Sequence, residues 1–115
     1  MRRPFRSKKV KGKMNQTEQW YHDEVLQRRV RNGELRKVYY EAVTFKMADR
    51  ATYTPDFYCL RTDGGVEIHE TKGYWREDDR VKIKVCASMF DEFYWYGVRI
   101  AKQRGVWKIL KTEEF

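Results

Sequence analysis

Two short motifs carry the residues best suited to chemistry: Pro55-Asp56 and, fourteen residues after the aspartate, Glu70-Thr71-Lys72. Side chains alternate between the two faces of a strand, so Glu70 and Lys72 are expected to point the same way. The Thr-Asp-Gly-Gly run at 62–65 predicts a turn that folds the Asp56 strand back beside them. Two carboxylates offer oxygen ligands to Mg²⁺ or Mn²⁺, and a neighbouring lysine can orient or deprotonate an attacking water. The pattern therefore predicts metal-dependent cleavage of a phosphodiester.

The same residues would also be present in an ordinary exposed hairpin with a cross-strand Asp–Lys pair. Such a pair contributes only about 0.2–1 kcal/mol. The neighbouring composition is typical of two paired strands, because Tyr53, Phe57 and Tyr58 are aromatic and Val66 and Ile68 are β-branched. Local signals predict the hairpin, whereas the choice between a catalytic site and an ordinary hairpin depends on the rest of the chain.

The motifs resemble those of the PD-(D/E)xK nuclease superfamily. Three longer runs, Thr52–Phe57, Glu70–Trp75 and Asp78–Lys82, are similar to the bacteriophage endonuclease I family of Holliday-junction resolvases, within a similarity that extends over about residues 14–101. The resemblance implies an α+β fold with a restriction-endonuclease-like core, a mixed central sheet flanked by helices. It also implies two Mg²⁺ or Mn²⁺ ions per site, paired nicks in branched DNA, and a domain-swapped homodimer.

The resemblance implies further members of the site. A glutamate on the first helix of the family completes the metal site, and Glu18 takes that place here, with Glu24 as the alternative. Glu18 also stands three residues after Asn15, where a capping-box glutamate belongs, so both roles stay open. The backbone carbonyl of Thr71 matches a metal ligand of the family, and its side chain is expected to face away from the site. His22 shares a helical face with Glu18 and could contact the scissile phosphate or a water, or be a surface residue.

Positive charge is concentrated at the N-terminus. Residues 1–13 hold seven basic residues and no acid, which leaves 18 of the 25 basic residues to face 17 acidic ones in the rest of the chain. We expect a flexible DNA-binding arm over 1–13 and a nuclease domain over 14–115. A solvated terminus is the alternative for the arm. The predicted DNA contacts are Arg2, Arg3, Arg6, Lys8, Lys9, Lys11 and Lys13 in the arm, and Arg76, Arg80 and Lys84 near the second helix.

Length and composition bound the class of protein. A chain of 115 residues is the size of one domain, and 41% hydrophobic residues are typical of a globular protein rather than a disordered one. No apolar run approaches the roughly 20 residues of a membrane span, and the basic N-terminus lacks the apolar segment of a signal peptide. A cytoplasmic protein with no membrane partner is expected. Cys59 and Cys86 fit no metal-ligand spacing and are expected to be packed, reduced residues.

Hydrophobic spacing and turn residues predict the order of the elements. The expected elements are a helix over 14–31, a long strand over 38–45 with an irregularity near 42–43, the Asp56 strand, a strand over 66–71, a helix over about 78–90, and strands over 93–101 and 106–110. This order, αβββαββ, matches the core of the superfamily.

Three other functions fit the same sequence. One is a nuclease of the same fold that acts on flaps, mismatches or linear duplex. Another is a catalytically silent DNA-binding module that has kept the fold. The third is an accessory protein whose basic arm binds an acidic protein.

Overall fold

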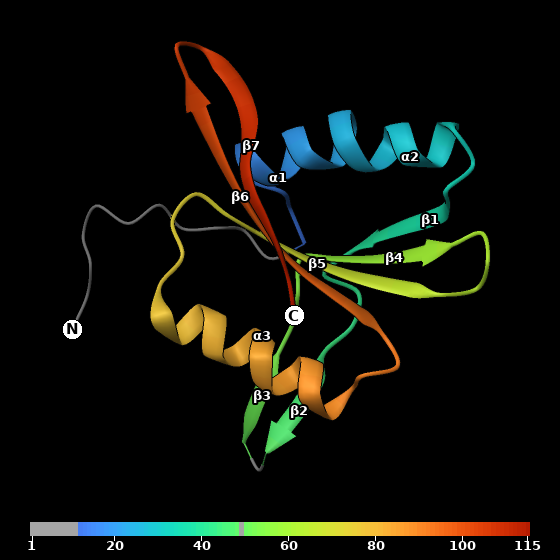
Figure 1. Cartoon of the computed structure of the whole chain (residues 1–115), viewed down its shortest axis with the longest axis vertical. Helices are drawn as coiled ribbons and strands as arrows, with labels where there is room; N and C mark the ends of the chain where they lie inside the picture. Colours follow the sequence, from blue (N-terminus) through green and yellow to red (C-terminus); the bar gives the residue numbers. More distant parts are fainter. Residues whose placement is uncertain (1–11, 49) are drawn as a thin grey trace.

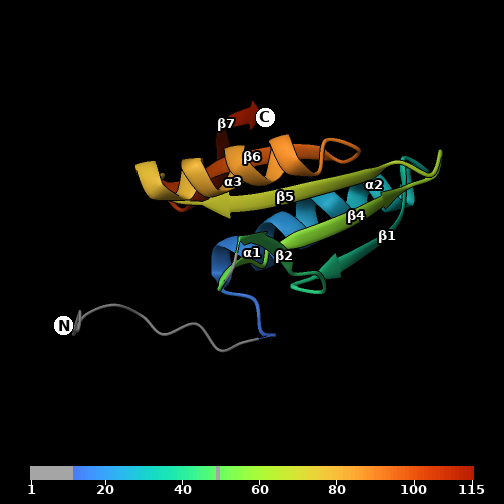
Figure 2. The same ribbon diagram turned by 90° about the horizontal axis from the view of Figure 1, so that it is seen from below.

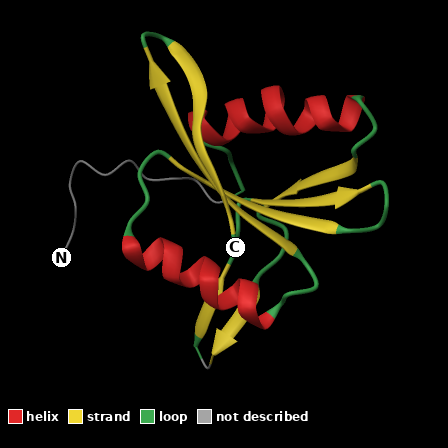
Figure 3. Ribbon diagram, in the orientation of Figure 1, coloured by secondary structure: helices red, strands yellow, loops and turns green. Residues whose placement is uncertain are grey.

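The computed structural model describes residues 12–48 and 50–115. Its elements are α1 (Gln16–Trp20), η1 (Tyr21–Leu26), α2 (Gln27–Arg31), β1 (Leu35–Tyr40), β2 (Phe45–Ala48), β3 (Ala51–Tyr53), β4 (Phe57–Arg61), β5 (Val66–Lys72), α3 (Glu77–Met89), β6 (Tyr94–Gln103) and β7 (Val106–Glu114) (Figures 1 and 3). The arm residues Arg2, Arg3, Arg6, Lys8, Lys9 and Lys11 lie outside the described residues, as does the predicted flexibility of the arm. In the described part of the chain no helix is long and apolar enough to cross a membrane.

The N-terminal helix runs without interruption through α1, η1 and α2. Asn15 caps it, because its side chain accepts a hydrogen bond from Glu18 N–H (2.8 Å) while Glu18 Oε1 accepts one from Asn15 N–H (3.0 Å). In η1 the turns widen to π-helical spacing, and Gln27 N–H donates to the carbonyl of His22, five residues earlier. The helix ends before Gly33, whose φ of 86° favours glycine. The helix predicted over 14–31 is confirmed.

The hairpin that carries both motifs is also confirmed. β4 and β5 pair antiparallel with Phe57 opposite His69, which places Asp56, the residue before β4, beside Glu70. The turn between the strands contains Gly64 at φ 94°, a backbone conformation that most other residues avoid. Local turn chemistry therefore brings the two carboxylates to one end of the hairpin.

The hairpin belongs to a five-stranded mixed sheet with the order β1-β4-β5-β6-β7. β5 and β6 are parallel and are joined by α3, whereas the other neighbours are antiparallel. The N-terminal helix covers one face of this sheet and α3 covers the other (Figures 1 and 2). β5 lies at the centre and is buried along almost its whole length. The motif Glu70-Thr71-Lys72 is therefore placed on the most enclosed strand of the fold.

The long strand predicted over 38–45 is wrong, because the chain forms two strands in different sheets. β1 pairs with β4, whereas β2 pairs with β3 in a separate two-stranded hairpin. The chain turns out of the sheet at Glu41, whose φ of 48° lies in the left-handed region. Five strands therefore separate the helices in sequence, in place of the three in the order αβββαββ. The mixed sheet flanked by helices is confirmed.

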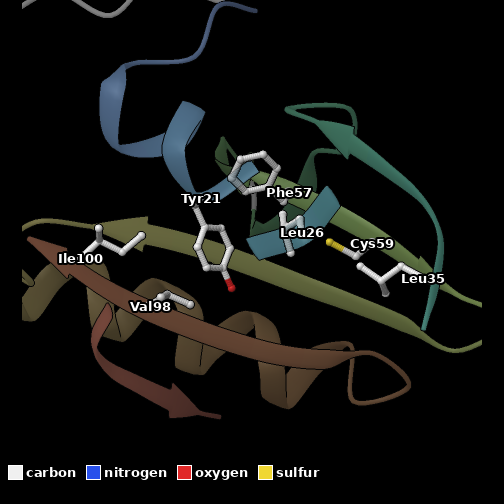
Figure 4. Close-up of a cluster of buried hydrophobic side chains, with 7 residues drawn as sticks. All are labelled: Tyr21, Leu26, Leu35, Phe57, Cys59, Val98 and Ile100. Carbon is white, nitrogen blue, oxygen red and sulfur yellow. The ribbon is translucent and has the colours of Figure 1, made fainter. Parts of the chain in front are cut away.

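Two apolar cores hold the helices to the sheet. Under the N-terminal helix, side chains from η1 meet residues of β1, β4 and β6 (Figure 4); the buried set is Tyr21, Leu26, Leu35, Phe57, Cys59, Val98 and Ile100. Under α3 the buried set is Phe45, Val66, Ile68, Ile83, Cys86 and Trp95. Cys59 and Cys86 are buried free thiols, as expected, and burial raises the pKa of Cys59 to about 12.

Candidate active site

Asp56 and Glu70 meet at the end of the hairpin. The backbone N–H of Asp56 donates to Oε1 of Glu70 (3.0 Å). Both residues are buried, with 5% and 8% of their surfaces exposed. Burial of a carboxylate is costly unless hydrogen bonds hold it, so the donors around these two residues are part of the site.

Thr71 holds the carboxylate of Asp56. Its N–H and its hydroxyl both donate to Oδ2 of Asp56, at 2.8 and 2.9 Å. The prediction that the Thr71 side chain faces away from the site is therefore wrong. Asp56 precedes β4 and is not constrained by the alternation of that strand, so its carboxylate reaches the face of β5 that carries Thr71.

Lys72 lies beside Glu70, as the alternation of β5 predicts. Its ammonium nitrogen is 3.6 Å from Oε2 of Glu70, and 35% of its side chain is exposed. Tyr53 of β3 donates its hydroxyl to Oε1 of Glu70 (2.8 Å). Burial, and then the charge of Glu70, raise the pKa of the Tyr53 hydroxyl far above its ordinary value, so the hydroxyl remains a donor. Glu70 is thus fixed at Oε1 and presents Oε2 toward Lys72.

Glu18 reaches the same region from the first turn of the N-terminal helix. The residue is 4% exposed, and its Oε1 accepts hydrogen bonds from Asn15 N–H (3.0 Å) and from the Tyr40 hydroxyl (2.7 Å). The capping role is therefore present. Glu18 also lines the cleft that contains Asp56, so the cap and a place in the site are compatible. Its role as a metal ligand stays a prediction.

A single cleft of about 350 Å³ joins these residues. Its lining consists of Asn15, Thr17, Glu18, Glu41, Thr54, Asp56, Glu70, Thr71, Lys72 and Gly73. Sequence reasoning missed Glu41, whose N–H donates to the carbonyl of Asp56 (2.8 Å) and whose Oε1 accepts from Gly12 N–H (2.9 Å). The irregular strand pattern next to Glu41 was the only signal in the sequence that pointed to it.

The donors of this cleft suit a hard divalent cation, because they are carboxylate and carbonyl oxygens. Within residues 12–48 and 50–115, however, no three His, Cys, Asp or Glu side chains gather closely enough to hold an ion. Asp56 and Glu70 are linked by the hydrogen bond from Asp56 N–H to Oε1 of Glu70, and both line the cleft together with Thr71. Mg²⁺ usually keeps several waters and is bound by only one or two carboxylates. The residues present therefore fit one ion at Asp56 and Glu70.

His22 and Glu24 of the N-terminal helix do not line the cleft. The ring of His22 stacks on Phe57, with centroids 6.2 Å apart, and its Nδ1 lies 2.8 Å from Oδ1 of Asp23. Glu24, the alternative to Glu18, is exposed and does not line the cleft. The structure thus brings Glu18 to the site and leaves His22 and Glu24 outside it.

The basic residues predicted around the second helix do not line the cleft either. Arg76 is exposed and directly precedes α3. Arg80 forms an ion pair with Glu113 of β7, and Lys84 lines a different cleft together with both of them. Neither Arg80 nor Lys84 is therefore placed beside Lys72. A long-range partner such as Glu113 leaves no local signal in the sequence.

A buried charge network lies on the other face of β5. Glu67, which is 2% exposed, accepts two hydrogen bonds from the Arg29 guanidinium (2.7 and 2.9 Å) and one from Arg61 (2.7 Å). Nε2 of His69 lies 2.8 Å from Glu67, and its Nδ1 lies 2.7 Å from the Tyr21 hydroxyl. Burial alone raises the pKa of Glu67, but the hydrogen bonds from Arg29, His69 and Arg61 outweigh it and hold that pKa well below its ordinary value. His69 lies on the face of β5 opposite Glu70 and Lys72, as the alternation of side chains along a strand requires.

Comparison with known proteins does not assign the chain to a family. No protein-family model matches the chain, and no curated protein is similar enough to count as a match. A function for the chain must therefore be argued from the residues of the cleft and their arrangement.

Proposed function

We propose that this protein is a divalent-metal-dependent endonuclease with a restriction-endonuclease-like fold, and that it makes paired nicks in branched DNA such as a four-way junction. One observation carries the proposal. Asp56, Glu70 and Lys72 line a single cleft, and Glu70 is linked both to the Asp56 N–H (3.0 Å) and to the Lys72 ammonium (3.6 Å). Two acids that can hold a cation and a lysine that can act on water are the groups that phosphodiester hydrolysis requires.

Each side chain has its own task in the proposed reaction. Asp56 and Glu70, with the carbonyl of Thr71 and with Glu18 as a further ligand, would hold Mg²⁺ or Mn²⁺. The metal, when bound, supplies Lewis acidity at the phosphate and lowers the pKa of water. Lys72 orients the attacking water, and its positive charge faces the phosphate as negative charge develops there. The donors that hold the two carboxylates fix them before substrate arrives, which removes a cost of reorganisation.

DNA is the proposed substrate because of the uneven charge of the chain. Residues 1–13 carry seven basic residues, whereas the rest of the chain is nearly neutral. Gly12, near the end of that segment, donates to Glu41 in the cleft (2.9 Å), so the basic segment joins the fold beside the proposed site. Each neutralised phosphate releases counterions, so the affinity for DNA is expected to fall steeply as salt is raised.

Branched DNA is the proposed form of the substrate because of the family resemblance. Two symmetric nicks in one junction require two sites, which a homodimer with twofold symmetry would supply. The assay is cleavage of a fixed-sequence four-way junction beside its linear duplex arms and a flap, in Mg²⁺. Paired nicks confined to the junction would support a dimeric resolvase. Equal cutting of all three substrates would leave a metal-dependent nuclease of broader substrate range.

A second function, DNA binding without catalysis, is favoured by one observation. Among the described residues no three acidic, His or Cys side chains gather closely enough to hold an ion. In that case the basic segment binds DNA and the cleft is catalytically silent.

Binding of Mn²⁺ separates the two functions. Calorimetric titration of the wild-type protein is expected to show a site that Asp56→Asn removes, because Asp56 is one of the two carboxylates proposed to hold the ion. Asp91→Asn, an exposed aspartate after α3, is the matched control and should bind as the wild type does. A wild-type protein that binds no Mn²⁺ at millimolar concentration would favour the silent module.

A further inference from the structure

A smaller cleft adjoins the proposed active site on the side of α3. It measures about 100 Å³ and is lined by Tyr53, Glu70, Lys72, Trp75, Asp79 and Lys82. Glu70 and Lys72 also line the larger cleft, so the two clefts share the residues at the proposed cleavage position. The other residues of the smaller cleft are therefore neighbours of Lys72 on the side of α3.

Lys82 is the basic residue of α3 that belongs to this cleft. Successive residues of an α-helix are rotated by roughly 100°, so Lys82 points away from the side that Arg80 and Lys84 share. That other side faces β7, where Arg80 pairs with Glu113 and lies 5.8 Å from the centre of the Phe115 ring. The fold thus puts Lys82 in one cleft with Lys72, whereas the sequence suggested Arg80 and Lys84 as the DNA contacts of this helix.

We infer that Lys82 binds a phosphate of the DNA strand next to the phosphate at Lys72, an inference that rests on the proposed function. The phosphates of one strand follow each other about every 3.4 Å along the duplex axis, so those adjacent to the cleaved one must lie close to Lys72. Lys82 is exposed and shares a cleft with Lys72, so its ammonium can reach such a phosphate without being desolvated first. Phosphate contacts of this kind fix the register of a strand in a site.

Asp79 brings a negative charge into the same cleft, and that charge has a function in the helix. Asp79 lies in the first turn of α3, where acidic residues are favoured, and its Oδ2 accepts a hydrogen bond from Arg76 N–H (3.3 Å). Its charge offsets part of that of Lys82. We therefore expect Lys82 to make one phosphate contact of ordinary strength, not a tight anion site.

The test compares Lys82→Gln with Lys84→Gln, because both variants remove one positive charge from an exposed position of α3. The affinity of the full chain for a labelled four-way junction is measured by fluorescence anisotropy between about 50 and 200 mM salt. The titrations contain EDTA, so that metal-dependent cleavage cannot proceed. Lys82→Gln is expected to weaken binding about fivefold at low salt and to reduce the slope of log Kd against log salt by about 0.9. Lys84→Gln is expected to change neither.

An unchanged slope for Lys82→Gln, or equal changes in the two variants, would overturn the inference. Cleavage of the same junction by the wild-type protein in Mg²⁺ is followed in parallel. If the wild type does not cut but Lys82→Gln still lowers the slope, the proposed enzyme fails while the phosphate contact stands. If the wild type cuts and both variants bind as it does, the enzyme stands and the contact is refuted.

Discussion

Replacement of the buried Glu67 by glutamine tests what holds the central strand in place. Glu67→Gln keeps the size of the side chain and removes its charge, which leaves the guanidinium groups of Arg29 and Arg61 facing a neutral amide. Breaking a buried ion pair by removing one partner costs about 3–5 kcal/mol. Arg29 and Arg61 keep some contact with water, at 26% and 23% side-chain exposure, so we expect a loss near the lower end, about 3 kcal/mol. That is a large share of the roughly 5–15 kcal/mol by which a domain is stable.

Glu34→Gln is the matched control, because Glu34 pairs with the same Arg29 (2.8 Å) but is half exposed. Its removal is expected to leave the free energy of unfolding almost unchanged. Urea denaturation followed by tryptophan fluorescence measures both variants, and the midpoint of Glu67→Gln is expected to fall by roughly 1–3 M with little change in slope. Equal midpoints for the two variants would refute the view that the buried network stabilises β5.

Three further outcomes can be tested, one in the buried charge network, one where β6 packs against Trp75, and one beside Glu70. The pKa of Glu67 is depressed from an ordinary value of 4.5, so the contribution of its charge to stability is complete above that pH and is lost as the pH falls further. The difference in the free energy of unfolding between wild type and Glu67→Gln, measured by urea denaturation at a series of pH values, should therefore shrink below about pH 4.5. Gly97→Ala would place a Cβ 2.7 Å from the Trp75 ring, and a loss of about 1–3 kcal/mol is expected in urea denaturation. Tyr53→Phe removes a donor to the carboxylate of Glu70, which should cost about 1–2 kcal/mol of stability and lower kcat more than it changes KM for DNA.

The elements closest to the site could be predicted because their signals are local. The Asn15 cap and the glycine after the first helix lie within a few residues of the helix ends that they specify. The Gly-containing turn of the hairpin likewise fixes the partner strand, and alternation then places Glu70 and Lys72 together. Local chemistry was therefore sufficient to predict the hairpin and the placement of Asp56, Glu70 and Lys72 together, whereas their part in catalysis stays a prediction.

The features that the sequence did not reveal depend on an unusual backbone conformation or on contacts between segments far apart in sequence. The strand break at Glu41 depends on a left-handed residue that is not glycine, and hydrophobic alternation alone does not reveal it. The partner of Arg80 is Glu113, thirty-three residues later, and it turns that side of α3 away from the proposed substrate path. The carboxylate of Asp56 bonds to Thr71 because Asp56 precedes its strand, a position where alternation no longer applies.

The most direct test of the central claim is single-turnover cleavage of a four-way junction in Mg²⁺ by the wild type and by Lys72→Ala. Lys108→Ala, which removes an exposed lysine of β7, is the control for loss of charge. The proposed mechanism predicts paired nicks by the wild type and by Lys108→Ala, and a rate at least about 100-fold lower for Lys72→Ala, as expected when a group that acts on water is removed. Cleavage by Lys72→Ala at the rate of the wild type would contradict the assignment of this cleft as the active site.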